Sequence, residues 1–397
     1  MRKLLIPGAG IYQVPLIRKA KEMGLFTVVA SIPGNWPGFR LADKVCEVDT
    51  TDCEGMLKAA REEKIDGIVT TGTDVAVRAI GYVCDVLGLH GISAEAAERL
   101  TDKAKMKTAF RGIVSTGDFR VVRTEEEAMQ AAGLLGYPVM VKAVDVSGSR
   151  GITRVERKED LAAAVLSAKS VSCKDYFVVE EAVDGTEIGL DAFVENGKTA
   201  AFFPHEKYVR RIGGTTIPAG HSFPYRGSKE TEAALRRELD AIVQASGMDN
   251  CAVNCDIMVK KDGTVSVIEA GGRCGATCIP ELIGIWSGID YYRQMILCAL
   301  GEETDFRTVS QVPCSARLLM SEKGGIVSAI DYTRLEEIKE KNEAEIQLDI
   351  REGDTVHSAR NGTDRFGHVI MKTDSEELID HVCEEIINTV VLKPETV

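Results

Sequence analysis

Residues 251–273 read CAVNCDIMVKKDGTVSVIEAGGR, and this stretch does most to decide the fold. An Asp-Gly pair at 262–263 separates two runs in which apolar residues recur with a period of two, a pattern that predicts a hairpin of antiparallel strands. A two-residue loop there places Asp256 directly opposite Glu269 and Asn254 opposite Gly271. Because opposed residues share one face of a sheet, the sequence predicts a pair of facing carboxylates.

The facing carboxylates allow two interpretations. A cation between them would relieve their repulsion, and a site made only of oxygen ligands favours Mg²⁺ or Mn²⁺. Asn254 could then supply a neutral oxygen to the same site. In the other interpretation the strands form a solvated edge and both acids point into water. The pattern alone leaves both open.

The chain on either side of this hairpin predicts a fold of the α/β and α+β classes. Strand-like runs alternate with helical patterns before residue 95, which indicates βαβ units and a parallel sheet, with Asp74 as the cap of a helix over 75–87. From residue 176 the period-two runs indicate antiparallel strands. We expect strands at 137–144, 177–181, 187–194, 199–204, 252–260 and 264–270, and helices at 13–23, 54–63, 94–111, 229–245, 280–300 and 375–387.

A lysine on a strand comes before a loop of small residues. Residues 139–143 read VMVKA and carry Lys142, and Ser147-Gly148-Ser149-Arg150-Gly151 follows. Consecutive backbone N–H groups in such a loop can form a nest for an anion, and the lysine would neutralise a phosphate. An ordinary turn with a solvated lysine is the alternative. The chain has no Gly-x-x-x-x-Gly-Lys-Ser/Thr motif, which excludes a P-loop ATPase.

Composition limits the partners and the compartment. The chain has 397 residues and a formal net charge of −13, which makes nucleic acid and an anionic membrane surface unlikely partners. No secretory leader and no membrane span are predicted. We expect a cytoplasmic protein whose 11 cysteines stay reduced, with Cys251, Cys255, Cys274 and Cys278 as small buried thiols. Residues 210–216 are interpreted as a substrate loop or a plain solvent loop.

Five degenerate motifs fall in a known order. They are Thr101-Asp102-Lys103, Lys142 with its small-residue loop, residues 179–187 (VEEAVDGTE), the Asp256 strand, and residues 268–273 (IEAGGR). In this order they resemble the ATP-grasp superfamily, in the branch that includes biotin carboxylase, carbamoyl-phosphate synthetase and the L-amino-acid ligases. The resemblance implies a Rossmann-like domain over 1–95, an ATP-grasp domain over 96–305 with a lid at about 115–185, and a C-terminal α+β lobe over 306–397.

The resemblance also implies a role for each matching residue. Lys103 and Lys142 would contact the phosphates of ATP, and the loop residues Ser147, Gly148, Ser149 and Gly151 would cover them. Glu180, Glu181 and Val183 would hold the adenine edge, and Glu187 would accept the ribose hydroxyls. Asp256 and Glu269 would bind Mg²⁺ or Mn²⁺. Arg273 would steady the substrate carboxylate or acyl phosphate, so that Lys142 and Arg273 are the implied catalytic residues.

The chain departs from the family at one position. Where Glu-x-Asn-x-Arg is common, this chain has Glu269-Ala270-Gly271-Gly272-Arg273, so the usual amide ligand is missing. Our hypothesis is that Asn254, opposite Gly271, takes over part of that role.

The resemblance implies an ATP-dependent carboxylate–amine ligase that forms an acyl phosphate and releases ADP and phosphate. Its partners would be a small-molecule carboxylate, a small-molecule amine and a second copy of the chain in a homodimer. One alternative is a bicarbonate-dependent enzyme of the N5-carboxyaminoimidazole ribonucleotide synthase type. Another is a nucleotide-binding regulator without turnover, against which the retention of both lysines and both acids argues.

Overall fold

The structure is a computed structural model that describes residues 1–146, 148, 150–212, 215–360 and 364–394, with only the backbone described at 211–212 and 215–216. The chain divides into two compact units. Unit 1 comprises Met1–Phe203, Gly227–Ala276 and Asp290–Phe306, and unit 2 comprises Pro204–Arg226, Thr277–Ile289 and Arg307–Val397. Most of the two domains expected before residue 305 therefore lies in one unit. The loop residues Ser147 and Ser149 lie outside the described residues.

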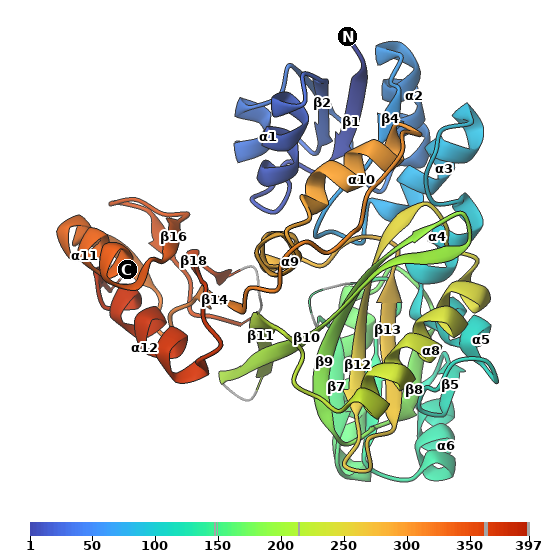
Figure 1. Cartoon of the computed structure of the whole chain (residues 1–397). Helices are drawn as coiled ribbons and strands as arrows, with labels where there is room; N and C mark the ends of the chain where they lie inside the picture. The colour runs from blue at the N-terminus through green and yellow to red at the C-terminus, as the bar shows by residue number, and fades with distance from the viewer. Residues whose placement is uncertain (147, 149, 213–214, 361–363, 395–397) are drawn as a thin grey trace. The chain divides into compact units, whose positions relative to one another are not determined.

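Unit 1 begins with a parallel sheet of the order β3-β2-β1-β4, as the alternating pattern predicted. Its apolar core includes Leu4 and Ile6 of β1 and Ile17 of α1, and Ile296 of the distant helix α10 packs against them. Figure 1 shows α10 near α1 and β1. The elements are β1 (Lys3–Pro7), α1 (Val14–Glu22), β2 (Phe26–Ser31), a 3-10 helix (Pro37–Arg40), β3 (Lys44–Glu47), α2 (Cys53–Glu63), β4 (Gly67–Ile68), α3 (Val77–Leu87) and α10 (Tyr291–Ala299).

Two antiparallel sheets follow in unit 1. The period-two runs predicted the antiparallel strands after residue 176 but not the strands at 119–122 and 152–155. One has the order β5-β8-β6-β7, and in the other β13, β12, β9 and the first part of β10 are neighbours. Their strands are β5 (Phe119–Val122), β6 (Val139–Lys142), β7 (Ile152–Val155), β8 (Phe177–Glu181), β9 (Thr186–Glu195), β10 (Lys198–Ile212), β12 (Cys251–Val259) and β13 (Val265–Gly271). The accompanying helices are α6 (Glu125–Leu135), a 3-10 helix (Lys158–Asp160), α7 (Leu161–Val171) and α8 (Lys229–Ser246).

Two expected long helices are each broken in two, which corrects the sequence interpretation. Residues 94–111 form α4 (Ala94–Leu100) and α5 (Lys103–Phe110), because the Asp102 side chain caps α5 by accepting from the N–H groups of Ala104 and Lys105. Residues 280–300 form α9 (Ile279–Ser287) and α10, separated by Gly288 in the left-handed conformation and by the cap residue Asp290. The first of these breaks places Lys103 at the beginning of a helix.

Unit 2 contains the C-terminal part of the chain and the second half of β10. Its sheet neighbours run from β10 through β11 and β14 to β18 and β16, and a smaller sheet has the order β17-β15-β19. Its elements are β11 (Thr215–Phe223), α9, β14 (Cys314–Leu319), β15 (Gly325–Ile330), α11 (Tyr332–Asn342), β16 (Glu345–Leu348), β17 (Thr355–Val356), β18 (Gly367–Met371), α12 (Glu376–Ile387) and β19 (Val390–Lys393).

The expectation of a loop over 210–216 is wrong, because most of these residues belong to the paired ends of β10 and β11. β10 and β11 pair as antiparallel strands, with Arg210 opposite Ile217 and Ile212 opposite Thr215. Farther along the ladder, His205 and His221 are buried with ring centroids 4.7 Å apart. Burial, followed by the nearby charge of His205, lowers the pKa of His221 well below its usual range. These two histidines are therefore interior residues of unit 2.

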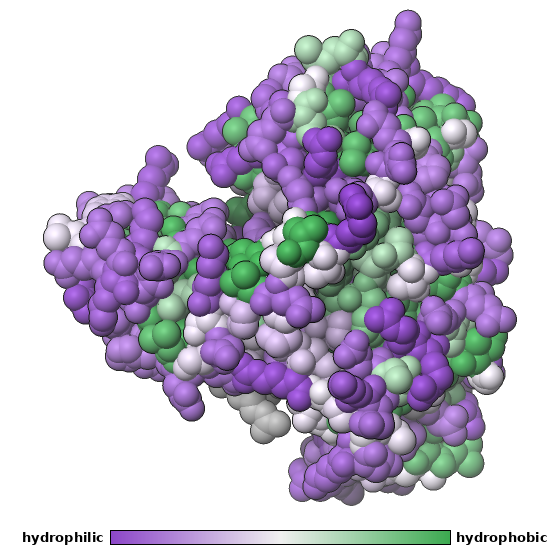
Figure 2. Space-filling view, in the orientation of Figure 1, coloured by the Kyte–Doolittle hydropathy of each residue, from purple (hydrophilic) through white to green (hydrophobic). Residues whose placement is uncertain are grey.

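Hydrophilic residues make up most of the molecular face in Figure 2, and apolar residues lie among them in smaller areas. Over the described ranges, none of the helices combines the length and the apolar character that a membrane span needs.

Candidate functional site

The two predicted carboxylates face each other across β12 and β13. Asp256 pairs with Glu269 and Asn254 with Gly271 in the antiparallel register, as predicted. The hairpin reaches this register by a different route, because Lys260 N–H donates to Thr264 O at 2.8 Å and the loop has three residues. The register then shifts between Asp256 and Ile257, which leaves Ile268 as an extra residue on β13. This bulge restores the pairing that a two-residue loop would give.

Five polar side chains form a stripe on one face of the β9, β12 and β13 strands. Along its other edge β12 pairs with β9, where Asn254 lies opposite Asp191 and Met258 lies opposite Glu187. Asp191 and Glu187 therefore point to the same face of the sheet as the acid pair. Gly189 lies opposite Asp256 and adds no side chain. The stripe consists of Glu187, Asp191, Asn254, Asp256 and Glu269. Of these, Asp191 was not predicted, although its period-two spacing from Glu187 could have indicated it.

Lys103 reaches this stripe from the first turn of α5. Its Nζ lies 3.2 Å from Glu269 Oε2 and donates to Val146 O at 3.0 Å, beside the small-residue loop. Burial alone would lower the pKa of Lys103, but Glu269 and Asp74 outweigh it and raise the pKa. Lys103 is therefore held as a cation between Glu269 and the loop.

The loop after Lys142 requires glycine at its end. Gly151 has φ +63°, and a Cβ there would lie 2.5 Å from Cγ2 of Val171. Gly151 O accepts from Ala143 N–H at 2.9 Å, which closes the loop onto β6. Gly148 also has a positive φ, of +72°. Any other residue type at Gly151 would be strained by the positive φ there and would displace Val171.

Lys142, Glu180 and Lys107 form a buried charge triad. The Glu180 carboxylate contacts the Lys142 ammonium with one oxygen, and its other oxygen lies 2.8 Å from Lys107 Nζ. The three side chains are 3–6% exposed. Burial acts to raise the pKa of Glu180, but Lys142 and Lys107 outweigh it and hold that pKa below its ordinary value. Two ammonium groups against one carboxylate leave a positive charge that favours an anion.

Lys107 was missed from the sequence. It lies one turn after Lys103 on the same face of α5, and this i,i+4 spacing was the available signal. Burial is the main reason why its pKa is lowered, and Glu180 opposes that effect. Its Nζ also donates to Thr116 Oγ1.

The predicted adenine hinge spans the end of β8, with Glu180 and Glu181, and the connection that follows it. Glu181 is exposed, and Val183 is half-buried in the connection to β9. The backbone N–H of Glu181 donates to Asp118 O at 2.8 Å, and that of Ala182 donates to Pro138 O at 3.2 Å. These bonds hold the connection against the strand, and Glu187 follows at the beginning of β9. The hinge and ribose assignments stay predictions.

Arg273 is held by two side chains. Its Nε lies 2.7 Å from Asp74 Oδ1 and its Nη2 donates to Asp74 Oδ2 at 3.0 Å, so the pair is bidentate. Nη1 donates to Asn254 Oδ1 at 2.8 Å. Burial would lower the pKa of Arg273, but Asp74 raises it above the ordinary value. The expectation that Asp74 caps α3 is wrong, because no side chain caps that helix.

Asn254 has contacts that differ from those expected of a metal ligand. Its amide nitrogen donates to Asp191 Oδ2 at 2.9 Å, while its oxygen accepts from Arg273. The other oxygen of Asp191 accepts from Gly275 N–H at 2.7 Å. Asn254 thus lies between an acid and a cation, and its assignment to the metal stays a hypothesis.

Asp74 lies where the usual amide side chain of the family would begin. A Cβ added to Gly271 would lie 3.1 Å from Asp74 Oδ1. Asp74 belongs to the loop that follows β4, and Thr71 in the same loop donates its hydroxyl to Tyr12 O at 2.6 Å. Gln13 donates its side-chain N–H to Thr71 O. Two loops of the parallel sheet are therefore joined and bring a carboxylate to Gly271.

The donor set suits a hard divalent cation. Asp256 and Glu269 offer only oxygen ligands, and Mg²⁺ usually takes one or two carboxylates with substrate phosphates. Within the described ranges, no group of three or more His, Cys, Asp or Glu residues is arranged to hold a metal ion. The two acids therefore fit an ion that arrives with a nucleotide.

The four cysteines singled out in the sequence are interior residues. Cys251, Cys255, Cys274 and Cys278 are buried, as predicted. Burial raises the pKa of Cys251 to about 12 and that of Cys255 well above its usual range. Cys173, in contrast, is exposed.

Comparison with known proteins gives the following similarities. Residues 135–281 match the ATP-grasp domain, and residues 317–393 match the L-amino acid ligase C-terminal domain 2. The alanine–anticapsin ligase of Bacillus subtilis is 27% identical over 293 residues, 66% of this chain and 60% of that protein. The D-alanine–D-alanine ligase of Kocuria rhizophila is 32% identical over 215 residues, 48% of this chain and 54% of that protein. The chain thus spans less than two thirds of these relatives.

Two solved structures cover the whole fold. Phosphoribosylglycinamide synthetase from Anaerococcus prevotii has a TM-score of 0.79 and 30% identity, and the similarity covers 99% of this chain and 100% of that one. An L-amino acid ligase from Bacillus licheniformis has a TM-score of 0.82 and 19% identity, covering 100% and 99%.

Proposed function

The chain belongs to the ATP-grasp superfamily, and from this premise we propose that it is an ATP-dependent carboxylate–amine ligase that releases ADP and phosphate. One observation carries the proposal. The buried triad leaves one positive charge uncompensated, and Lys103 lies one helical turn from Lys107 on the same face of α5. Such a group of ammonium ions suits the phosphates of a nucleotide.

In the proposed reaction a carboxylate oxygen of the substrate attacks the γ-phosphorus of ATP, and ADP leaves. The nitrogen of an amine then attacks the acyl carbon, phosphate leaves and the nitrogen loses a proton. Lys103, Lys107 and Lys142 hold and neutralise the phosphate groups during the first step. We place the acyl group of the substrate beside the Arg273 guanidinium, which contacts Asp74 and Asn254.

Asp256 and Glu269 are the residues that would hold Mg²⁺ or Mn²⁺. When bound, the ion offsets charge on the transferring phosphoryl group. Lys103, 3.2 Å from Glu269, would keep that carboxylate oriented. Asp191 and Asn254 would position Arg273.

The substrates are proposed by class. The C-terminal match to an L-amino acid ligase domain supports an amino acid or a similar small metabolite as the carboxylate. A small-molecule amine is the second substrate. The loops at Tyr12 and Thr71 lie at the ends of parallel strands, where α/β proteins bind ligands.

A second candidate rests on the 30% identity to phosphoribosylglycinamide synthetase. In this candidate the amine is carried on a phosphorylated sugar rather than on an amino acid. The reaction class and the nucleotide site are the same in both candidates, and only the amine-binding side differs.

Phosphate release from ATP tests the proposal. The purified chain is incubated with ATP and Mg²⁺ and with three pools, which contain amino acids, amino acids with sugar-phosphate amines, or bicarbonate with nucleotide precursors. Stimulation by the first pool supports the ligase, and stimulation by the second alone supports the second candidate. Stimulation by bicarbonate alone, or ATP binding without release in any pool, would contradict the ligase.

A further inference from the structure

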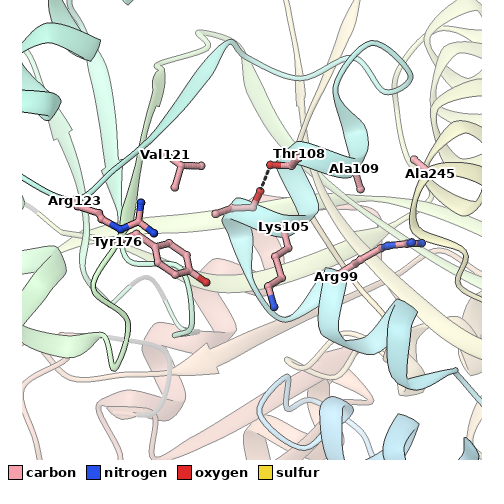
Figure 3. Close-up of a pocket in the computed structure, with 9 residues that line it drawn as sticks. Arg99, Lys105, Thr108, Ala109, Val121, Arg123, Tyr176 and Ala245 are labelled. Carbon is pink, nitrogen blue, oxygen red and sulfur yellow. Dashed lines mark hydrogen bonds between the residues drawn. The ribbon is translucent and has the colours of Figure 1, made fainter.

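A cavity of about 610 Å³ lies in unit 1 over the outer face of α5. Figure 3 shows Arg123 and Tyr176 on one side of α5, Arg99 and Ala245 on the other, and Lys105 between them. A volume of this size suits a small organic ligand. The cavity is lined by Arg99, Ala104, Lys105, Thr108, Ala109, Val121, Arg123, Tyr176 and Ala245.

The lining is cationic although the protein is acidic. It contains Arg99, Lys105 and Arg123, and none of the described residues that form it is an acid. Because the whole chain has a net charge of −13, a lining with three cationic side chains and no acidic one differs from the average charge of the protein. A concave surface with one sign of charge concentrates ligands of the opposite sign.

The acids that contact these cations lie outside the lining. Arg123 Nε is 3.4 Å from Asp175, which is 78% exposed, while Glu95 contacts Arg99 and Glu98 contacts Lys105. Ion pairs between exposed side chains contribute only about 0.2–1 kcal/mol. A bound anion could therefore replace these partners at low cost.

Apart from Thr108, the rest of the lining is apolar and aromatic. Ala104, Ala109, Val121 and Ala245 contribute methyl groups. The Arg123 guanidinium lies 5.7 Å from the centre of the Tyr176 ring, so the aromatic face and a cation are side by side. A ligand with an apolar body and one or two anionic groups matches this combination.

The cavity is linked to the nucleotide site through the first turn of α5. Tyr176 donates its hydroxyl to Asp102, and Asp102 accepts from Ala104 N–H at 2.9 Å and Lys105 N–H at 3.1 Å. Lys105, Thr108 and Ala109 line the cavity, while Lys103 and Lys107 on the same helix meet Glu269 and Glu180. A ligand that contacts Tyr176 or Lys105 would therefore act on the turn that positions Lys103.

We propose that this cavity binds a small organic anion, with a carboxylate or phosphate group on an apolar body, and that the ligand alters nucleotide affinity through α5. This site is separate from the proposed ligase site. Its test is direct binding, so its failure is distinguishable from a failure of the ligase proposal.

The test uses the full chain and isothermal titration calorimetry with three probes. They are 4-phenylbutyrate, phenyl phosphate and the neutral 4-phenyl-1-butanol. We expect at least one anion to bind and the alcohol to bind about tenfold more weakly or not at all. Stronger binding of phenyl phosphate identifies a phosphate ligand, and stronger binding of 4-phenylbutyrate a carboxylate. No binding of either anion, or equal binding of the alcohol, would overturn the proposal.

Variants locate the site. The K105Q/R123Q variant should weaken anion binding by about tenfold or more, whereas the matched variant K58Q/R61Q on α2 should leave it unchanged. Thermal unfolding of both variants confirms that each is folded. If a variant does not fold, the comparison of the anions with the alcohol in the unmodified chain still tests the proposal. Equal weakening by both variants would contradict the assignment to this cavity.

The coupling is measured by repeating the titration with a saturating non-hydrolysable ATP analogue and Mg²⁺. Because coupling is reciprocal, the analogue should change the anion's Kd by about twofold or more without abolishing binding. Complete displacement would mean that the probe occupies the nucleotide site, and an unchanged Kd would contradict the link through α5.

Discussion

Arg273 and Asp74 form a bidentate ion pair although they are 199 residues apart in the sequence. Asp74 comes from a loop after the parallel sheet, and Arg273 follows β13, the strand that carries the proposed metal ligand Glu269. The pair therefore joins the proposed substrate loop to the proposed phosphoryl-transfer site. Asp74 also lies 3.1 Å from the place where a side chain at Gly271 would begin.

Removal of the charge on Asp74 should damage both stability and turnover. D74N leaves the Arg273 charge without its main partner, and breaking a buried pair costs about 3–5 kcal/mol. Because Asp74 is 29% exposed and the amide still accepts one hydrogen bond, we expect about 1–3 kcal/mol. Urea unfolding measures this change. D160N, which affects the exposed pair with Arg157, is the control and should cost no more than about 0.5 kcal/mol.

Gly271 and Asp74 should be energetically coupled. In G271A the added methyl group meets Asp74 Oδ1 and weakens its pairing with Arg273. In D74A the same methyl group meets no carboxylate. A double-mutant cycle should therefore give a coupling of about 0.5–3 kcal/mol. Additive effects of the two substitutions on the free energy of unfolding would show that Asp74 does not occupy this place in solution.

Lys107 should be needed for nucleotide binding. K107M removes one of the two cations that contact Glu180, so the triad loses the charge that attracts phosphate. We expect the Kd for ATP to rise about tenfold or more. K58M, at a lysine on α2 that is 76% exposed, is the control and should change it less than about twofold. Fluorescence titration with a labelled nucleotide compares them, and equal effects would argue against the triad as a phosphate site.

Asp256 and Glu269 should set the metal requirement. D256N and E269Q each remove one of the two facing charges, so the Mg²⁺ concentration for half-maximal turnover should rise about tenfold. D262N, in the exposed turn of the same hairpin, serves as the control. If N254A alone raised the Mg²⁺ requirement as much, Asn254 would be a ligand, whereas an effect confined to substrate affinity would indicate positioning of Arg273.

Glu180 should contribute a stability that depends on pH. Lys142 and Lys107 hold its folded-state pKa below the ordinary value of 4.5. Such a carboxyl group stabilises the folded protein fully above its ordinary pKa, and the contribution is lost as pH falls through the lowered pKa. The difference in unfolding free energy between the native chain and E180Q should be constant from about pH 8 to 6 and should shrink below about pH 4.5. A difference that grows toward low pH would contradict this charge arrangement.

The strand pattern was enough to place the two acids, although the loop was misjudged. Gly263 ends a three-residue loop, and the bulge at Ile268 compensates for the additional residue. A bulge depends on packing on both faces of a sheet, so the spacing of Asp262 and Gly263 could not indicate it. The period of the side chains was sufficient to show which residues share the face.

Contacts between distant segments were not predictable in the same way. Asp74 has the local signature of a helix cap, and its pairing with Arg273 requires the tertiary fold. Lys107 reads as one of several lysines in a helix rich in Ala and Lys, and only the position of Glu180 makes it part of the site. Residues 94–111 read as one helical stretch because the alanine-rich and lysine-rich residues on both sides of Asp102 favour a helix.

The most direct test of the ligase proposal follows oxygen atoms. The chain is incubated with ATP, Mg²⁺ and a pool of L-amino acids labelled with ¹⁸O in the carboxylate, and the released phosphate and new amides are analysed by mass spectrometry. An acyl phosphate transfers one labelled oxygen to phosphate, so we predict ADP, an amide and phosphate that carries one ¹⁸O. Phosphate without the label, or ATP that is bound but not cleaved, would contradict the proposal.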